Sequence, residues 1–152
     1  MKTKSILITL CLFCTSMGFA QNKIFDKYAD MDDVSSIYIS KAMFQIMPNV
    51  ERIGVNLMNL KGKIESLQLV SSNNKERVTQ MKKDFPQLVT SQHQELMRIK
   101  EEKNHNVKIY ADMKGEQVKE LIMLIDDRDK YTAILLVGNF TIKDIQEIVE
   151  QM

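Results

Sequence analysis

Cysteine is nearly missing from this chain of 152 residues, and both copies, Cys11 and Cys14, lie close to the N-terminus. The rest of the chain therefore has no thiol for a disulfide framework or for a cysteine nucleophile. Proline occurs only twice, and the five glycines are scattered. With so few chain breakers, and no repeat or low-complexity tract, we expect one continuous domain.

Histidine is equally sparse, and the familiar catalytic motifs are missing. His93 and His105 are the only histidines, and because neither has other ligand-type residues at useful spacing, we expect both on a solvated loop or helix face. There is no Gly-x-Ser-x-Gly elbow, no Gly-rich phosphate loop and no His-Glu-x-x-His pattern. The sequence thus indicates no catalytic residue, no cofactor-binding residue and no metal ligand. An enzyme based on paired carboxylates stays open.

The first residues have the pattern of a cleavable signal peptide. A positive region with Lys2 and Lys4 precedes a mainly apolar segment over 6–14, and small residues follow up to Ala20. We expect cleavage after Ala20, which makes Gln21 the first residue of a single domain over 21–152. The apolar run is shorter than the roughly 18 to 20 residues that span a bilayer, which favours cleavage over a retained anchor.

The two cysteines could instead mark lipid attachment in an exported lipoprotein. A lipobox needs a small residue directly before its cysteine, whereas Leu10 and Phe13 occupy those positions. We therefore expect an exported protein that is periplasmic rather than lipid-anchored or extracellular, with no membrane insertion after cleavage.

An excess of charge of either sign is also missing. The chain has 21 basic and 20 acidic residues, and cleavage after Ala20 would remove two lysines and no acid, leaving 19 basic residues. Because a polyanion is bound through clustered surplus Lys and Arg, this balance argues against nucleic acid and anionic membrane surfaces as partners. The basic face of the helix expected after residue 73 is interspersed with acids, which is typical of a solvated surface.

What the sequence does contain is a series of short strand-like and helix-like segments. The segment 33–47 predicts a strand followed by a helix that Ser40 caps and Pro48 ends. The residues expected on the buried face of this helix are Ala42, Met43, Ile46 and Met47. Weaker helical signals cover 50–60. A second strand is expected over 64–70, with Leu67 and Leu69 on one face.

A longer helix is predicted to begin after Asn73, with Glu76 as a capping-box partner. Its expected buried residues are Val78, Met81 and Phe85. Pro86 should end or kink this helix, because proline lacks the amide hydrogen and restricts the preceding residue. Two predictions stay open for the next segment: a strand over 96–100, which we favour, and a helix from Leu88 to Lys103.

The clearest strand runs from Val107 to Met113, where apolar and polar residues alternate with the period of a half-buried strand. Polar turns at 102–105, 114–117 and 126–130 separate it from strands expected over 96–100, 118–125 and 131–140, so the four strands should form an antiparallel meander. The uninterrupted apolar run 134–137 indicates a central strand that is covered on both faces. Gly138 marks a bulge or a close approach.

The last predicted element is a helix that Thr141 caps, with Asp144 at the capping-box position. Its apolar stripe consists of Ile142, Ile145, Ile148, Val149 and Met152. The fold class that these segments predict is α+β: a mainly antiparallel sheet, including a C-terminal four-strand meander, with helices packed on one face.

Five segments in this order carry a resemblance to a known family. They are VSSIYISKAMF from Val34, KIESLQL from Lys63, ELMRI from Glu95, KELIML from Lys119 and LVGNFT from Leu136. The chain resembles the exported domain-of-unknown-function family 4252 of Bacteroides-type bacteria over nearly all of the mature chain. The resemblance implies a fold rather than a site, and it supplies no catalytic residues. Some members are encoded near extracytoplasmic-function sigma factors, which points toward envelope signalling.

Two residue clusters could bind a metal, and each has a simpler structural explanation. Asp126, Asp127 and Asp129 could hold calcium, but no Gly and Glu follow at EF-hand spacing, so a hydrophilic hairpin turn is favoured. An equally unspecific acidic cluster covers 30–33. Methionine is frequent enough to suggest a copper(I) site, but the residues in question occupy predicted buried faces, where thioethers fill gaps. They are Met43, Met47, Met81, Met113 and Met123.

We therefore predict a noncatalytic binding or envelope-signalling module whose expected partner is an envelope protein. An antiparallel sheet with helices on one side can present its other face or an edge strand to such a partner. Tyr110, on the polar face of its strand, and Tyr131 are the candidate binding-surface residues. Two alternatives stay open: a carboxylate-dependent hydrolase or metal-binding enzyme, which needs acids converging in an apolar pocket, and a self-associating structural protein, which an uncovered edge strand would favour. The oligomeric state is left open.

Overall fold

The computed structural model describes residues 17–46, 60, 62–102 and 104–150. The strands are β1 (Ser35–Ser40), β2 (Ile64–Ser72), β3 (His93–Lys100), β4 (His105–Lys114), β5 (Gln117–Asp127) and β6 (Lys130–Thr141). The helices are α2 (Met17–Ala29), α3 (Lys41–Ile46), α4 (Lys75–Asp84), the 3-10 helix η4 (Phe85–Leu88) and α5 (Ile142–Val149). Cys11, Cys14, Met47, Pro48, the helical signals over 50–59 and Met152 lie outside the described residues.

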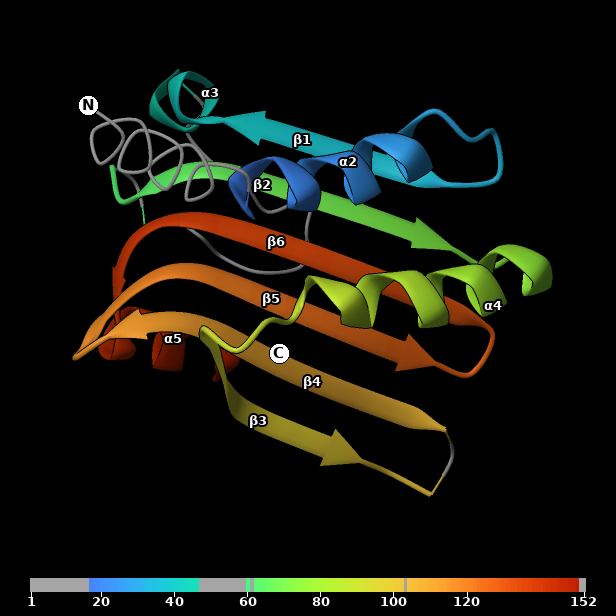
Figure 1. The fold of residues 1–152 in the computed structure, drawn as a ribbon. Coiled ribbons are helices and arrows are strands. Elements are labelled where there is room, and N and C mark those ends of the chain that lie inside the picture. Colours follow the sequence, from blue (N-terminus) through green and yellow to red (C-terminus); the bar gives the residue numbers. More distant parts are fainter. Residues whose placement is uncertain (1–16, 47–59, 61, 103, 151–152) are drawn as a thin grey trace, which may run out of the picture.

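All six strands form one antiparallel sheet in the order β1-β2-β6-β5-β4-β3 (Figure 1). Consecutive strands β3 to β6 are joined by short turns and lie side by side, so the predicted four-strand meander is confirmed. The chain crosses from β2 to β3 through α4, which leaves the central place between β2 and β5 for β6. The α+β class and the mainly antiparallel sheet are both confirmed.

The apolar run in β6 explains why this strand is central. Ile134 and Leu136 belong to the core on one face of the sheet, and Ala133 and Leu135 belong to the core on the other. Successive side chains of a strand point to opposite faces, so a strand without polar positions needs cover on both sides. The prediction that 134–137 lies centrally and is buried on both faces is correct.

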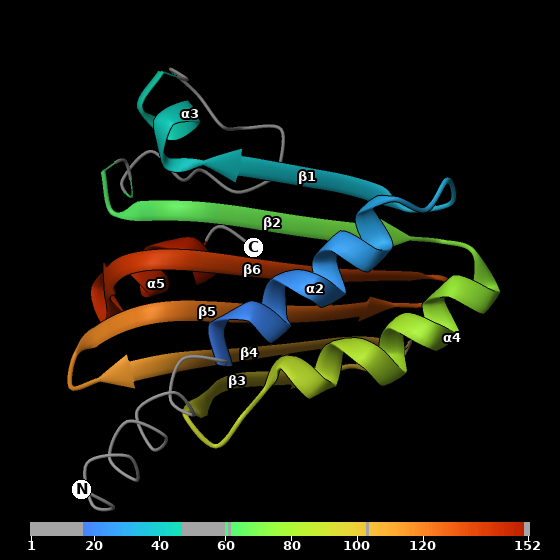
Figure 2. The ribbon, with the colours of Figure 1, turned by 45° about the horizontal axis from the view of Figure 1, so that its top comes forward.

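The helices divide between the two faces of the sheet. The two longer helices, α2 and α4, lie in front of the sheet in Figure 1, and α5 lies behind it (Figure 2). The cores agree, because Phe25 and Met81 pack on the front face, whereas Phe44 of α3 and Ile145 of α5 pack on the other. The expectation that all helices pack on one face therefore holds only for the two longer ones. Both faces of the sheet carry buried apolar side chains, so helices are needed on both faces to shield them from water.

Helix α2 was not predicted from the sequence. It buries Phe25 and Tyr28, which are 2% and 0% exposed. Tyr28 also donates a hydrogen bond to a carboxylate oxygen of Asp84 at 2.7 Å, and Lys27 donates to the same oxygen at 2.9 Å. These bonds attach α2 to the end of α4, and the bond from Lys27, together with that from Tyr28, lowers the pKa of Asp84. The expected cleavage position after Ala20 falls within α2 and stays a prediction.

The strand and helix predicted over 33–47 are present as β1 and α3, but the buried face of α3 is not the expected one. The hydroxyl of Ser40 accepts a hydrogen bond from the backbone N–H of Met43 at 3.4 Å, in the predicted capping role. Phe44 is the buried residue of this helix, whereas Met43 and Ile46 are 46% and 74% exposed. In a helix of only six residues the apolar periodicity is too short to determine which side packs.

The helix predicted after residue 73 is α4, and its N-cap is Asn74 rather than Asn73. The side-chain oxygen of Asn74 accepts hydrogen bonds from the backbone N–H groups of Glu76 and Arg77, at 3.0 and 3.1 Å. Val78, Met81 and Phe85 are buried as predicted. The helix ends at Asp84, directly before the η4 turn that contains Pro86, so the expected break is confirmed.

The segment after η4 forms strand β3, and the alternative helix from Leu88 to Lys103 is wrong. β3 pairs with β4 from His93 to Lys100. A register shift between Glu95 and Met97 interrupts the regular alternation of this strand. That bulge explains why the sequence around Leu96 lacks a clear strand period.

The C-terminal helix has the predicted capping box and an additional ion pair. Asp144 accepts hydrogen bonds from the backbone N–H and the hydroxyl of Thr141, at 2.7 and 2.9 Å, and its own N–H donates to the Thr141 hydroxyl. Lys63, directly before β2, forms a salt bridge to Asp144 at 2.7 Å. Burial alone would raise the pKa of Asp144, but the bonds from Lys63 and Thr141 outweigh it and lower the pKa.

Replacement of Asp144 by asparagine should therefore destabilise the protein in a pH-dependent way. At pH 7 we expect Asp144→Asn to lower the free energy of unfolding by about 1 to 2 kcal/mol. A carboxyl whose pKa is lower in the folded state stabilises above its unfolded pKa of about 4, and this contribution is lost as the pH falls through the folded value. Urea unfolding should thus show a smaller difference between the two proteins at pH 3.

Asp129→Asn, at an exposed hairpin position, is the matched control and should change stability little at either pH. A destabilisation by Asp144→Asn that stays the same at pH 7 and pH 3 would contradict the role assigned to the ionised carboxylate.

Candidate functional site

A cleft of about 650 Å³ lies between the end of α4 with η4 and the strands β3 and β4. Its lining residues come from α4, from η4 with the residue after it, and from the strands β3 to β6. In Figure 1, β3 and β4 are the strands that α2 and α4 leave uncovered on the front of the sheet. This volume is within the usual range for ligand sites. The cleft is lined by Lys82, Pro86, Val89, Arg98, Ile99, Lys100, Asn106, Lys108, Tyr110, Leu124, Asp126 and Tyr131.

The two tyrosines predicted from the sequence both line this cleft, although they differ in burial. Tyr131 is only 4% exposed, and its ring packs 6.3 Å from that of Phe85, so it forms part of the floor and of the core. Tyr110 is half-buried on the same sheet face, and burial raises its pKa. Tyr110 is thus the tyrosine that a ligand in the cleft can contact more fully.

The cleft carries four cations and one carboxylate. Lys82 forms a salt bridge to that carboxylate, Asp126, at 2.9 Å. Arg98 pairs at 2.6 Å with Glu95 on its own strand. Among the described residues, Lys100 and Lys108 form no ion pair, so the local balance of the cleft is positive although the whole chain is close to neutral.

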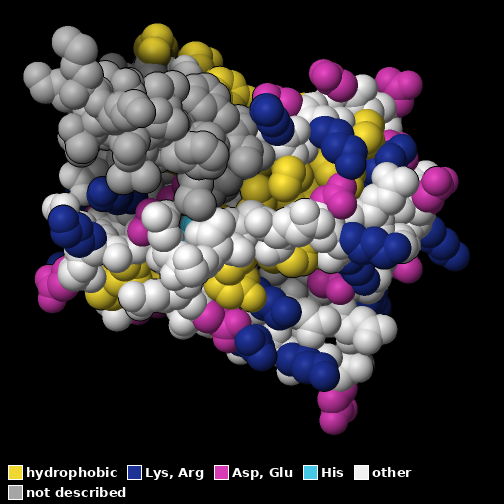
Figure 3. All heavy atoms as spheres, in the orientation of Figure 1, with side chains coloured by type: hydrophobic (Ala, Val, Ile, Leu, Met, Phe, Trp, Pro, Cys, Tyr) yellow, Lys and Arg dark blue, Asp and Glu magenta, His cyan; other side chains and the backbone are white. Residues whose placement is uncertain are grey.

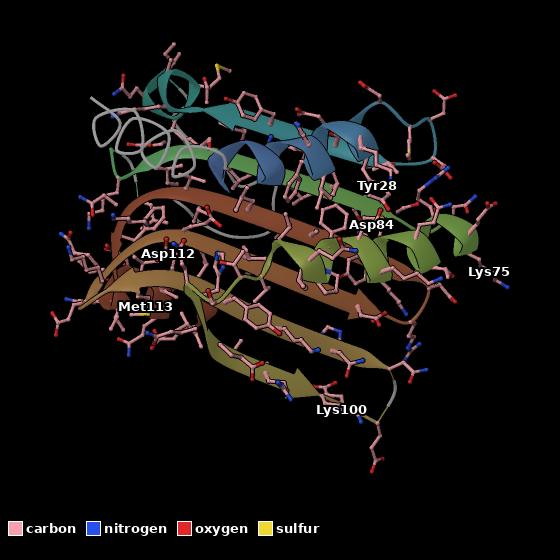
Figure 4. All side chains as sticks on the ribbon, in the orientation of Figure 1. Tyr28, Lys75, Asp84, Lys100, Asp112 and Met113 are labelled. Atoms are coloured by element: carbon pink, nitrogen blue, oxygen red, sulfur yellow. The ribbon has the colours of Figure 1, made fainter. Side chains whose placement is uncertain are left out.

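The strand register itself brings like charges together. Arg98 of β3 lies directly opposite Lys108 of β4, and Lys100 lies opposite Asn106 on the same side. Like charges directly opposite each other destabilise an antiparallel pair. Figure 3 shows dark blue side chains over this part of the face, and Figure 4 labels Lys100 near the end of β3. Glu95 already offsets part of this repulsion, because the hydrogen bond from Arg98 at 2.6 Å and the nearby charge of Lys108 both lower the pKa of its carboxyl.

The sequence did not predict this cleft. Lys82 belongs to the basic helix face that was interpreted as a solvated surface, and the other three cations were not singled out. Arg98 and Lys100 alternate along β3, which is the spacing that puts both side chains on one face of a strand. That signal was present in the sequence, but the region could also be read as a helix. Lys82 and Lys108 join them only through the position of α4 and the pairing of β3 with β4.

The two histidines are not on a solvated loop or helix face, because both lie in strands. The side chain of His93 is only 3% exposed. Its Nδ1 accepts a hydrogen bond from the backbone N–H of Thr90 at 3.0 Å, so Nε2 carries the proton and donates to Glu120 at 2.9 Å. This bond reaches from edge strand β3 across β4 to β5. His105 is less buried and lies 3.5 Å from Asp127.

The acidic residues around Arg128 form a hairpin turn, as favoured from the sequence. Arg128 has a positive φ of 47° at the tip of the turn between β5 and β6. Asp126 and Asp127 point to different partners, Lys82 and His105. Within the residues that the structure describes, no group of three or more His, Cys, Asp or Glu side chains is placed to hold a metal ion.

Only some of the methionines that were predicted to be buried are buried in the structure. Met81 and Met123 are buried in the two cores, and Met113 is half-buried. Met43 is exposed, which corrects the prediction. The side chain of Met43 therefore does not fill a gap in the core.

Other cavities lie among the described residues, and two of them are compared with the cleft. One of about 420 Å³ lies between α2 and the β1–β2 pair and is lined by one carboxylate, that of Asp26. The other, of about 510 Å³, lies between α5 and β3–β4 and has one carboxylate, that of Glu150. Each of these two cavities is thus lined by one acidic side chain, as is the cleft between α4, η4 and the strands β3 and β4, which we call the basic cleft.

The fold is that of an α+β protein built on a six-stranded antiparallel sheet. The sequence profile of the family described as a domain of unknown function, DUF4252, matches residues 28–148, and the chain belongs to this family. No curated protein and no solved structure is significantly similar to the chain. None of the helices in the described part of the chain is long and apolar enough to cross a membrane.

Proposed function

We propose that this protein is an exported, noncatalytic binding module of the cell envelope that holds an acidic segment of an envelope partner in its basic cleft. The observation that carries the proposal is the charge balance of the cleft, whose walls carry four cations. Lys82 is paired with Asp126 and Arg98 with Glu95, which leaves two lysines without an ion pair among the described residues. Lys100 and Lys108, without an ion pair among the described residues, would bind the carboxylates of the partner.

The chemistry of the cleft walls also supports an acidic peptide segment as the ligand. Val89, Leu124 and the ring of Tyr110 line the cleft beside the cations. A peptide offers apolar side chains for these surfaces as well as carboxylates for Arg98 and the lysines. The guanidinium of Arg98 presents a planar fork of donors, so it can bind a carboxylate of the partner beside its existing bond to Glu95 at 2.6 Å.

The test is capture of the partner from the native envelope. The tagged protein, expressed near its native level, is crosslinked mildly, purified and analysed by mass spectrometry beside the cleft variant Lys100→Glu/Lys108→Glu. We expect a specific partner with the unaltered protein and its loss in the cleft variant. The same spectra should show Gln21 as the N-terminus if the protein is exported and cleaved as proposed.

The matched control is Lys75→Glu/Lys143→Glu, which makes the same change of net charge at exposed positions outside the cleft. It should retain the partner. Tyr110→Ala is a second cleft variant, whereas Tyr131 is unsuitable because its removal would open the core. Recovery of the same partner with the cleft variant, or no partner with any protein, would contradict the proposal.

A further inference from the structure

The two edges of the sheet differ in how they are protected against pairing with another strand. Edge strand β3 has a register shift between Glu95 and Met97 and carries the charges of Arg98 and Lys100. Bulges and charged side chains are the usual devices that keep an edge strand from pairing further. Edge strand β1 has neither: it pairs with β2 over six consecutive residues without a shift, and its sequence SSIYIS contains no charge and no proline.

The β1 edge and the helix that follows it also carry exposed apolar side chains. Tyr38 of β1 is 64% exposed, and Met43 and Ile46 of the following helix α3 are 46% and 74% exposed. These residues account for half of the large hydrophobic side chains that are exposed in the described part of the chain. Figure 2 shows β1 as the outermost strand, with α3 at its end. A partner that adds a strand to β1 would cover this surface.

The charges at the two ends of β1 indicate which partner fits. Asp32 and Asp33 precede the strand, and Lys41 follows it. When two copies of a strand pair antiparallel about a two-fold axis, the beginning of each lies beside the end of the other. Lys41 of each copy would then face Asp32 and Asp33 of the second copy. Asp33 already pairs with Arg77 at 3.0 Å, whereas Asp32 and Lys41 form no ion pair among the described residues.

We propose that two copies of this chain associate through antiparallel pairing of β1, which joins their sheets into one. The segment is self-complementary, with a neutral strand flanked by acidic residues on one side and by Lys41 on the other, and this is what an interface between identical surfaces requires. β1 and β3 are opposite edges of the sheet, so the basic cleft beside β3 stays open in the dimer. The proposal is therefore independent of the ligand of the cleft.

The affinity should be modest. A pair of six-residue strands and a few flanking side chains bury less surface than a standard protein interface, so we expect a dissociation constant of roughly 1 to 100 μM. Light scattering and sedimentation equilibrium over a concentration series up to about 0.3 mM cover this range.

A charge-swap experiment tests both the interface and its orientation. Lys41→Glu alone places like charges together at both ends of the pair, and so does Asp32→Lys alone, and each should weaken dimerisation about tenfold or more. The double variant Asp32→Lys/Lys41→Glu restores opposite charges and should restore association. Lys143→Glu, in the first turn of α5, is the control and should dimerise like the unaltered protein.

Tyr38→Lys adds the protection that β1 lacks, and because Tyr38 is largely exposed, the variant should keep its circular dichroism spectrum while becoming monomeric. A protein that stays monomeric throughout the concentration series would overturn the proposal. So would a dimer that is insensitive to both single charge substitutions and to Tyr38→Lys, or a double variant that fails to regain association.

Discussion

Gly138→Ala should lower the free energy of unfolding by about 2 to 3 kcal/mol, the range for forcing an extra group into a packed site. A Cβ atom at Gly138 would overlap the backbone carbonyl oxygen of Lys63 and lie 2.6 Å from the ring of Phe140. That carbonyl cannot move freely, because it accepts a hydrogen bond from the N–H of Asn139 at 2.8 Å. Urea unfolding at neutral pH measures the loss.

Gly115→Ala provides the comparison, because it separates crowding from conformational strain. Gly115 has a positive φ of 64° but open space around the position of a Cβ, so alanine should cost only about 1 kcal/mol there. Equal losses for the two variants would show that β6 can move away from Lys63. The close approach at Gly138 would then add nothing to the cost of replacing a glycine.

Phe85→Ala should have a larger effect, a loss of about 3 to 5 kcal/mol. Phe85 is fully buried, and its ring centre lies 5.2 Å from that of Phe25, 5.1 Å from that of Tyr28 and 6.3 Å from that of Tyr131. The side chain thus joins α2 to the sheet beneath it. Urea unfolding gives the total loss, and amide hydrogen exchange should show that α2 loses protection before the central strands.

Gln87→Ala, at an exposed position of the same 3-10 helix, is the control and should change stability by less than about 0.5 kcal/mol. If Phe85→Ala cost no more than Gln87→Ala, the aromatic cluster would contribute little, and α2 would have to be held to the domain by Asp84 instead.

Predictions from the sequence succeeded where the signal is local. The alternation in β4 follows from the period of a half-buried strand, and Val107, Ile109 and Ala111 are all buried as it predicts. The capping residues Thr141 and Asp144 act within one helical turn, so their role can be read without knowledge of the rest of the fold. The same holds for the break at Pro86.

The elements that sequence reasoning missed depend on partners far away in the chain. α2 packs through Phe25 and Tyr28, and both need Phe85, about sixty residues further on, to become buried. The buried side chain of His93 is bonded to Glu120, which lies on β5, two strands away in the sheet. In α3 the residues that pattern alone assigned to the core are exposed, because the orientation of so short a helix is set by the strand before it.

The basic cleft combines both kinds of information. Tyr110 and Tyr131 were chosen from the sequence as candidate binding residues, and the fold places both in the cleft. The cations around them were not predicted, because the total charge of the chain is close to neutral and hides a local excess. Only the crossing of α4 over the sheet sets Lys82 beside the β3–β4 pair.

The sequence by itself determined the α+β class, the meander, the central position of β6 and the caps at Ser40 and Thr141, because periodicity and capping depend on neighbouring residues. The tertiary structure decided which helices cover which face, which histidine is buried, where the positive charges gather and which edge is left unprotected. These features arise from contacts between residues distant in the chain, and such contacts leave no periodic signal in a single sequence.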